Sequence, residues 1–167
     1  ALCREIKATF RSRLSDLASN DHSILRLFID SPDRIFDDPG ADRVKISGAK
    51  NIFAHPEFQK KNLLTEDEFQ SIIELIDNEE VVIHVLERST QGLAPVGTES
   101  SGVSIRIGSE LEDRNMTNYS LICTKYQFGD QKGIIGLIGP KRMDYARIAP
   151  LVDYVAHTMS AVLTPRP

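Results

Sequence analysis

The sequence predicts an α+β fold in which an antiparallel sheet is covered by a C-terminal helix. Between residues 103 and 138, three runs of strand-type residues follow one another with short connections, which favours antiparallel pairing. After Pro140, apolar residues recur every three or four positions from Tyr145 to Val162, as on a helix that lies across a sheet. Upstream of residue 90 the patterns are mostly helical, so the N-terminal half is expected to be mainly helical.

The first 64 residues carry several short elements. A helix is expected over residues 1–20 and another over residues 23–29, followed by a turn at 37–40, a short strand at 44–46 and a helical turn at 49–53. The first helix carries four cations, which are Arg4, Lys7, Arg11 and Arg13. Acidic residues interrupt them and no recognition helix follows, so a solvated helix side is favoured over a nucleic-acid face.

The clearest helix of this half opens at Thr65. The segment Thr65-Glu-Asp-Glu68 has the form of a capping box, with threonine at the N-cap and glutamate three positions later. The expected buried side consists of Phe69, Ile72, Ile73, Leu75 and Ile76. The β-branched run from Val81 to Leu86 leaves two alternatives open, a continuing helix or a strand after a break at Asp77-Asn78.

A turn-rich stretch at residues 91–102 is the best candidate for an internal boundary, because the pattern changes there from helical to alternating. Beyond it, Val103, Ile105 and Ile107 alternate with polar residues, which predicts a half-buried strand with its apolar side inward. A short helical connection is expected over residues 111–118. Strands are expected at 119–128 and 132–138, joined by a turn at Gly129-Asp130.

Composition and charge limit the function. The chain has 167 residues and a formal net charge of −4, whereas a region that binds DNA by itself usually shows a basic face. Cys3 and Cys123 are isolated, which fits a reducing cytoplasm, and Cys123 is expected to be a small buried apolar group. No apolar run approaches the eighteen residues of a membrane span. Because the pattern is already helical at Ala1, we expect a fragment of a longer protein.

The sequence shows no catalytic, metal or cofactor constellation. Four scattered histidines, His22, His55, His84 and His157, have no second ligand at metal spacing. The glycines Gly133, Gly136 and Gly139 precede Lys141, but Gly-Lys-Ser/Thr is missing and Pro140 removes an N–H where a phosphate loop needs one. Close packing against a helix is therefore the favoured role of these glycines. No nucleophile elbow and no separated carboxylate pair are present.

The polar cluster after Pro140 is the most informative part of the chain. Pro140 stops the strand, and Asp144 is a good N-cap for the next helix. Two accounts of the cluster formed by Arg142, Asp144, Tyr145 and Arg147 stay open. In the first, Asp144 caps the helix and an arginine pairs with a carboxylate. In the second, the cluster belongs to an interface, within a dimer or toward another domain.

The segment Gly136-Leu-Ile-Gly-Pro-Lys-Arg-Met-Asp-Tyr-Ala-Arg-Ile148 closely resembles the C-terminal signature of HrcA, the bacterial heat-inducible transcription repressor family. Two upstream segments are also similar, Lys45–Phe53 with Pro56-Glu-Phe58, and Val103–Gly108. Lys141 departs from the pattern, where threonine is more usual. The matched signature residues are Gly139, Pro140, Arg142, Met143, Asp144, Tyr145, Ala146 and Arg147.

The resemblance implies a domain organisation. HrcA proteins combine a winged-helix DNA-binding domain, a GAF-like domain and an inserted dimerising domain. Residues 1–95 resemble the inserted dimerising region, and residues 96–167 resemble the second half of the GAF-like domain. The winged helix has no counterpart in this sequence.

The resemblance also implies a function. The expected role is that of a regulatory and dimerisation fragment of a cytoplasmic repressor of chaperone operons, with no enzymatic activity and no cofactor. Its expected partners are a second copy in a homodimer, the chaperonin, and an inverted-repeat operator bound only through the absent domain. A GAF-like module that senses a small molecule is the alternative.

Overall fold

A computed structural model of the chain describes residues 65–99 and 101–163, together with Ala8 and Ser12. The chain divides into two compact units, Ala1–Leu63 and Leu64–Pro167, and the elements below belong to the second. Ala8 and Ser12 are helical and exposed, as the expected helix over residues 1–20 requires at these two positions. The other expectations for residues 1–64 lie outside the described residues.

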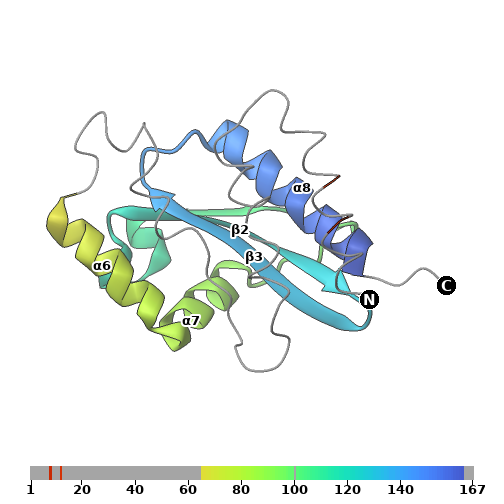
Figure 1. Cartoon of the computed structure of the whole chain (residues 1–167), viewed down its shortest axis with the longest axis horizontal. Coiled ribbons are helices and arrows are strands. Elements are labelled where there is room, and N and C mark those ends of the chain that lie inside the picture. The colour runs from red at the N-terminus through yellow and green to blue at the C-terminus, as the bar shows by residue number, and fades with distance from the viewer. Residues whose placement is uncertain (1–7, 9–11, 13–64, 100, 164–167) are drawn as a thin grey trace. The chain divides into compact units, whose positions relative to one another are not determined.

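The second unit combines helices with a three-stranded antiparallel sheet of order β1-β2-β3 (Figure 1). In chain order its elements are α6 (Glu66–Asp77), α7 (Glu79–Ser89), β1 (Ser104–Ile107), the 3₁₀ turns η1 (Gly108–Leu111) and η2 (Arg114–Met116), β2 (Tyr119–Phe128), β3 (Gln131–Pro140) and α8 (Tyr145–Leu163). Helix α8 packs mainly on β2. The predicted α+β class, an antiparallel sheet covered by the C-terminal helix, is confirmed.

The helical segment before the sheet is broken once, at Asn78. Helix α6 begins at Glu66, directly after Thr65, as the sequence predicts. Of the two alternatives for Val81–Leu86, the helix is correct, because these residues lie within α7. The Asn78 carboxamide accepts a hydrogen bond from the Val81 N–H at 3.4 Å and so caps the new helix. Burial of Val82 and Val85 on one helix face outweighs their β-propensity.

Strand β2 is the centre of the sheet. It spans Tyr119–Phe128 as predicted, and the turn at Gly129 has φ 57°, which glycine adopts readily. Three consecutive residues of β2, Leu121, Ile122 and Cys123, are all fully buried although they alternate between the two faces. A strand buried on both faces is typical of a sheet centre.

The expectation for β1 was right in period and wrong in face. Ile105 and Ile107 are each 38% exposed, whereas Ser104 and Arg106 are partly covered. The register places Ser104 beside Cys123, which in turn pairs with Gly136. The Leu86 side chain of α7 lies against this row, since a Cβ on Gly136 would lie 2.9 Å from the Leu86 Cδ2 atom, although Gly136 itself is partly open to solvent. The covering helix therefore decides which face of β1 is buried.

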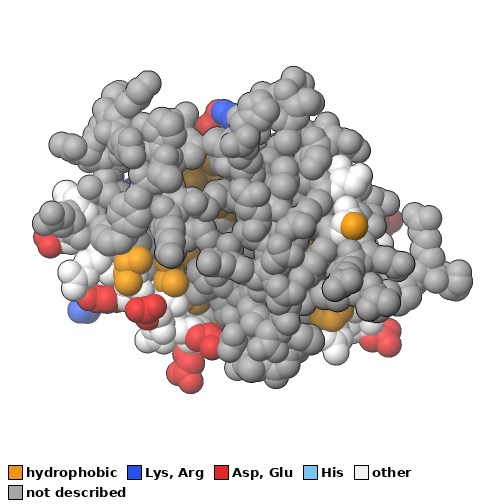
Figure 2. Space-filling model, in the orientation of Figure 1, with side chains coloured by type: hydrophobic (Ala, Val, Ile, Leu, Met, Phe, Trp, Pro, Cys, Tyr) orange, Lys and Arg blue, Asp and Glu red, His pale blue; other side chains and the backbone are white. Residues whose placement is uncertain are grey.

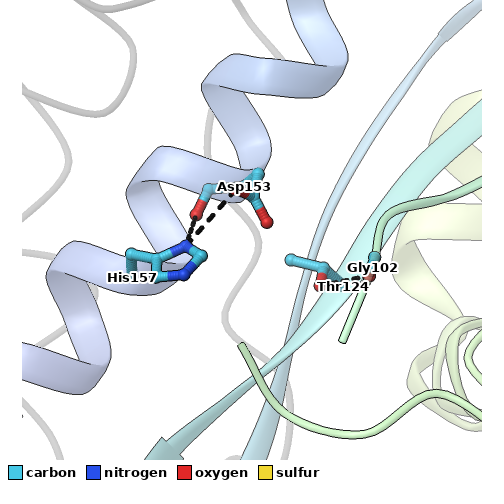
Figure 3. A network of polar contacts seen from close by, with 4 residues as sticks. All are labelled: Gly102, Thr124, Asp153 and His157. Carbon is cyan, nitrogen blue, oxygen red and sulfur yellow. Dashed lines mark hydrogen bonds and ion pairs between the residues drawn. The ribbon is translucent and has the colours of Figure 1, made fainter. Parts of the chain in front are cut away.

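The turn-rich stretch after α7 is irregular, as predicted, but it packs against the sheet. Strand β1 pairs with β2 only as far as Cys123. Beyond that point the Lys125 carbonyl of β2 accepts a hydrogen bond from the Val96 N–H of the turn-rich stretch at 2.9 Å. Farther along β2, the Gln127 N–H donates to the Ser160 hydroxyl of α8 at 3.0 Å. The Thr124 hydroxyl donates to the Gly102 carbonyl at 2.7 Å (Figure 3). The predicted helical connection over residues 111–118 is helical in part, because η2 lies within it and η1 ends at its first residue, Leu111. A domain boundary near residue 95 stays a prediction.

Candidate functional site

The signature segment forms the exit from β3 and the start of α8. Packing requires a glycine at its first matched residue, Gly139. Gly139 is buried at the end of β3, and a Cβ there would collide with the Met143 sulfur. Met143 therefore folds back over the strand end, which only a glycine leaves room for. Gly136 and Gly133 are similar, because their missing side chains make room for Leu86 and for the Tyr126 ring. The prediction that the glycines pack closely against a helix is confirmed for Gly136, which meets α7, whereas Gly133 and Gly139 pack against Tyr126 of β2 and Met143 of the turn.

Pro140 ends the strand without leaving a polar group unsatisfied. It pairs in register with Tyr119, and its carbonyl accepts a hydrogen bond from the fully buried Ser120 hydroxyl at 2.9 Å. The next N–H, of Lys141, donates to the Asn118 carbonyl at 3.3 Å. Proline has no N–H to donate, so these neighbours hold the strand end together.

Asp144 caps α8, as predicted. Its carboxylate accepts a hydrogen bond from the Arg147 N–H at 3.3 Å, and its carbonyl accepts from the Ile148 N–H at 3.0 Å. The Tyr145 hydroxyl donates to the Lys141 carbonyl and closes the turn. A carboxylate at this position also meets the positive end of the helix dipole. The capping half of the first account is therefore correct.

The remaining signature residues lie on the surface. Arg142, Ala146 and Arg147 are exposed, and Met143 is half-buried. Arg147 also has a further interaction, so this residue is not without a partner. Within residues 65–99 and 101–163, no ion pair of Arg142 is found. The turn is thus held by its own hydrogen bonds, and Arg142 is exposed to solvent.

Helix α8 follows the predicted apolar stripe. Ile148, Val152, Val155 and Met159 are buried, whereas Tyr145 and Val162 are half-buried. The helix continues through Pro150, which is exposed, as predicted from the unbroken stripe. The kink expected at this proline stays a prediction.

The other chemically interesting side chains take structural or surface positions. Cys123 is fully buried, and this burial raises the pKa of its thiol from 9.0 to about 12, although Arg106 and Ser104 act in the opposite direction. His84 is exposed on α7. His157 lies 2.9 Å from the Asp153 carbonyl oxygen and 3.4 Å from its carboxylate, one turn earlier on α8 (Figure 3). His22, His55 and Cys3 lie outside the described residues.

The described part of the chain has neither a metal-binding cluster nor a membrane-spanning helix. No group of three or more His, Cys, Asp or Glu side chains there could hold a metal ion. None of its helices is long and apolar enough to cross a membrane.

The surface of α6 and α7 is acidic. Exposed carboxylates gather on this helix pair, at the lower left of Figure 2, and they are Asp67, Glu74, Asp77, Glu79, Glu80 and Glu87. Such a surface repels the phosphates of DNA. This helix pair therefore lacks the basic surface that would attract nucleic acid.

Comparison with known proteins identifies the family. The model of the HrcA protein C-terminal domain matches residues 2–149. The chain belongs to the HrcA family. Curated relatives agree: the heat-inducible transcription repressor HrcA of Chlorobium phaeobacteroides (strain BS1) is 32% identical over 162 residues, and that of Chlorobium limicola is 31% identical over 164 residues. These matches cover 96% and 98% of this chain but 44% of each relative, so the chain spans less than half their length.

A solved structure supports the fold. The crystal structure of a hypothetical protein is similar with a TM-score of 0.55 and 20% identity, over 90% of this chain and 42% of that one. At this identity the similarity concerns the fold alone. The predicted HrcA resemblance, made from the signature around Gly139 and Asp144, is confirmed by the family match.

Sequence reasoning missed two contributors to this region. Ser120 lies 19 residues before Gly139 yet holds the strand end, and the Lys141 side chain lies against Gly108, where a Cβ would come within 2.8 Å of its Cε atom. A serine within an apolar strand was the only sequence signal for the first. Nothing in the sequence marks the second.

Proposed function

We propose that this chain is the regulatory and dimerisation part of a heat-inducible repressor of chaperone operons, and that another part of the longer protein binds the operator. The family match carries this proposal. The acidic surface of α6 and α7 and the net charge of −4 support a role away from DNA. We further propose a cytoplasmic protein without enzymatic activity.

The second half of the chain, residues 96–167, is proposed to be one half of a GAF-like domain. Strand β3 supports this, because Gly133-Ile-Ile-Gly-Leu-Ile-Gly139 is apolar on both faces, as in a central strand. Yet in the described part of the chain β3 has a partner on one side only, and its four large aliphatic residues are only half-buried. An apolar strand with an open edge calls for a further strand. Relatives more than twice as long have the residues to supply it.

Homodimerisation through residues 1–95 is proposed from the family resemblance, as is an interaction with the chaperonin. A two-fold protein suits an inverted-repeat operator. Sedimentation of the chain at high micromolar concentration should show a dimer, and the association should be weakened by apolar-to-charged changes within residues 1–95 rather than within α8. A strictly monomeric chain would count against this proposal.

The proposed division of labour has a direct test. In a mobility-shift assay at physiological salt, the intact protein should give a sequence-dependent complex with its operator, and this chain alone should give none. Added in excess to the intact repressor, the chain should lower operator binding, because mixed dimers hold one DNA-binding domain each. A specific complex with the chain alone would overturn the assignment.

A further inference from the structure

Glu112 has an unusual backbone conformation. It is the one non-glycine residue with a positive φ, 54°, among those that the structure describes. This left-handed region places the Cβ close to the following carbonyl, and residues other than Gly, Asn and Asp rarely adopt it. Such a conformation persists only where the surroundings hold it.

An ion pair holds the Glu112 side chain. Its carboxylate pairs with the guanidinium of Arg88, which lies in the last turn of α7. The two side chains are 53% and 50% exposed, so water and salt reach the pair. The Glu112 N–H also donates to the Ser109 carbonyl at 3.1 Å and ends η1. A side chain of α7 thus contacts the strained residue at the end of η1.

The backbone on both sides of Glu112 is anchored. Leu111, just before it, is 4% exposed, and Met116 in η2 is fully buried. The Asp113 carboxylate accepts a hydrogen bond from the Asn115 N–H at 2.8 Å and starts η2. Helix α6 packs against η2. The connection between β1 and β2 therefore contacts both helices of the α6–α7 pair.

Helix α7 contacts the sheet at β1 and at β3. Its Leu86 side chain lies over Gly136 of β3. The hairpin of β2 and β3, in contrast, has ten paired positions and carries α8. Separation of α7 would leave this hairpin and α8 intact.

We propose that the Arg88–Glu112 ion pair is a conformational latch between the α6–α7 pair and the sheet. While it is closed, Glu112 stays left-handed and α7 stays seated on Gly136. When it opens, Glu112 relaxes to a negative φ and α7 separates, whereas β2, β3 and α8 stay folded. The position of the helix pair is thereby coupled to the conformation of the β1–β2 connection, and this coupling does not depend on operator binding.

Native-state hydrogen exchange of the 167-residue chain tests the latch. Glu112→Gln removes the charge but keeps the backbone strain of the closed state, so α7 amides should exchange about threefold faster while β2 and β3 amides are unchanged. Arg88→Gln should have the same effect, and the double variant should add little to either change. Added salt should speed α7 exchange in the parent chain and not in Glu112→Gln. Glu87→Gln, one residue before Arg88, is the matched control and should change nothing.

Glu112→Gly separates the strain from the charge. It removes both, so its α7 amides should exchange about threefold more slowly than those of Glu112→Gln. Equal exchange in these two variants would refute the strained latch. Equal acceleration of α7 and the β2–β3 hairpin in Glu112→Gln, or no acceleration at all, would show that the pair couples nothing.

Discussion

The exit from β3 and the β1 side of the sheet are built in different ways. At the exit, Gly139, Pro140 and Asp144 each do what their residue type does in any protein: they leave room, end a strand and cap a helix. On the β1 side, the buried face of the strand and the side chain of Glu112 are in contact with α7, which is distant in sequence. The first region can be understood from a few neighbouring residues, and the second only from the assembled fold.

The largest expected effect concerns the connection after β1. Met116→Ala removes a fully buried side chain from η2 and should lower the free energy of unfolding by about 2–5 kcal/mol. Arg114→Ala changes an exposed residue of the same 3₁₀ turn and is the control. If denaturant melts show equal stabilities for both variants, the connection is not held by its buried side chain.

Gly136→Ala tests the seat of α7. The added Cβ would lie 2.9 Å from Leu86 Cδ2 and 3.1 Å from Leu121 Cδ1, so overpacking should destabilise the chain by about 1–3 kcal/mol. Gly102→Ala adds a methyl group where nothing lies within 4 Å and should be nearly neutral. If thermal melts show no change in stability for Gly136→Ala, then Leu86 of α7 does not determine which face of β1 is buried.

Asp144→Ala tests the local rules at the strand exit. Loss of the cap should lower the free energy of unfolding by about 0.5–2 kcal/mol without loss of the fold. Asp144→Asn should keep most of the hydrogen bond, so its free energy of unfolding should lie between those of the parent chain and Asp144→Ala. Denaturation curves that superimpose for all three proteins would favour the interface account of this cluster over the cap.

Ile105→Thr should have the smallest effect. The side chain is 38% exposed, so the change in the free energy of unfolding should stay within about 0.5 kcal/mol. Its cross-strand partner Ile122 is fully buried, and Ile122→Thr should cost about 2 kcal/mol or more. Similar losses in both variants would restore the original expectation that the apolar side of β1 faces inward.

The sequence predicts the elements of this unit better than their environments. Period, caps and turns located α6, β2, β3 and α8 because each signal is local, and Asn78 was correctly placed at the break between helices. The choice between helix and strand at Val81–Leu86 stayed open because β-branched residues suit either structure until burial selects one. The face of β1 was missed because alternation gives a period without a direction.

The candidate site shows the same division. The signature residues and the cap were found from sequence, since they lie within nine consecutive positions. Ser120 and the Arg88–Glu112 pair were not found, because each joins positions about 20 residues or more apart and leaves no periodic pattern.

The β2–β3 hairpin also has a consequence for how the chain folds. A two-residue turn joins ten paired positions, and α8 follows after four residues, so the best-buried part of the sheet consists of contacts close in sequence. Contacts of this kind form quickly, and they favour a nucleus within residues 119–163. These residues follow the rest of the chain during synthesis, so α6, α7 and β1 leave the ribosome before the surface that seats them exists. The helix pair therefore depends on a partner that is made after it.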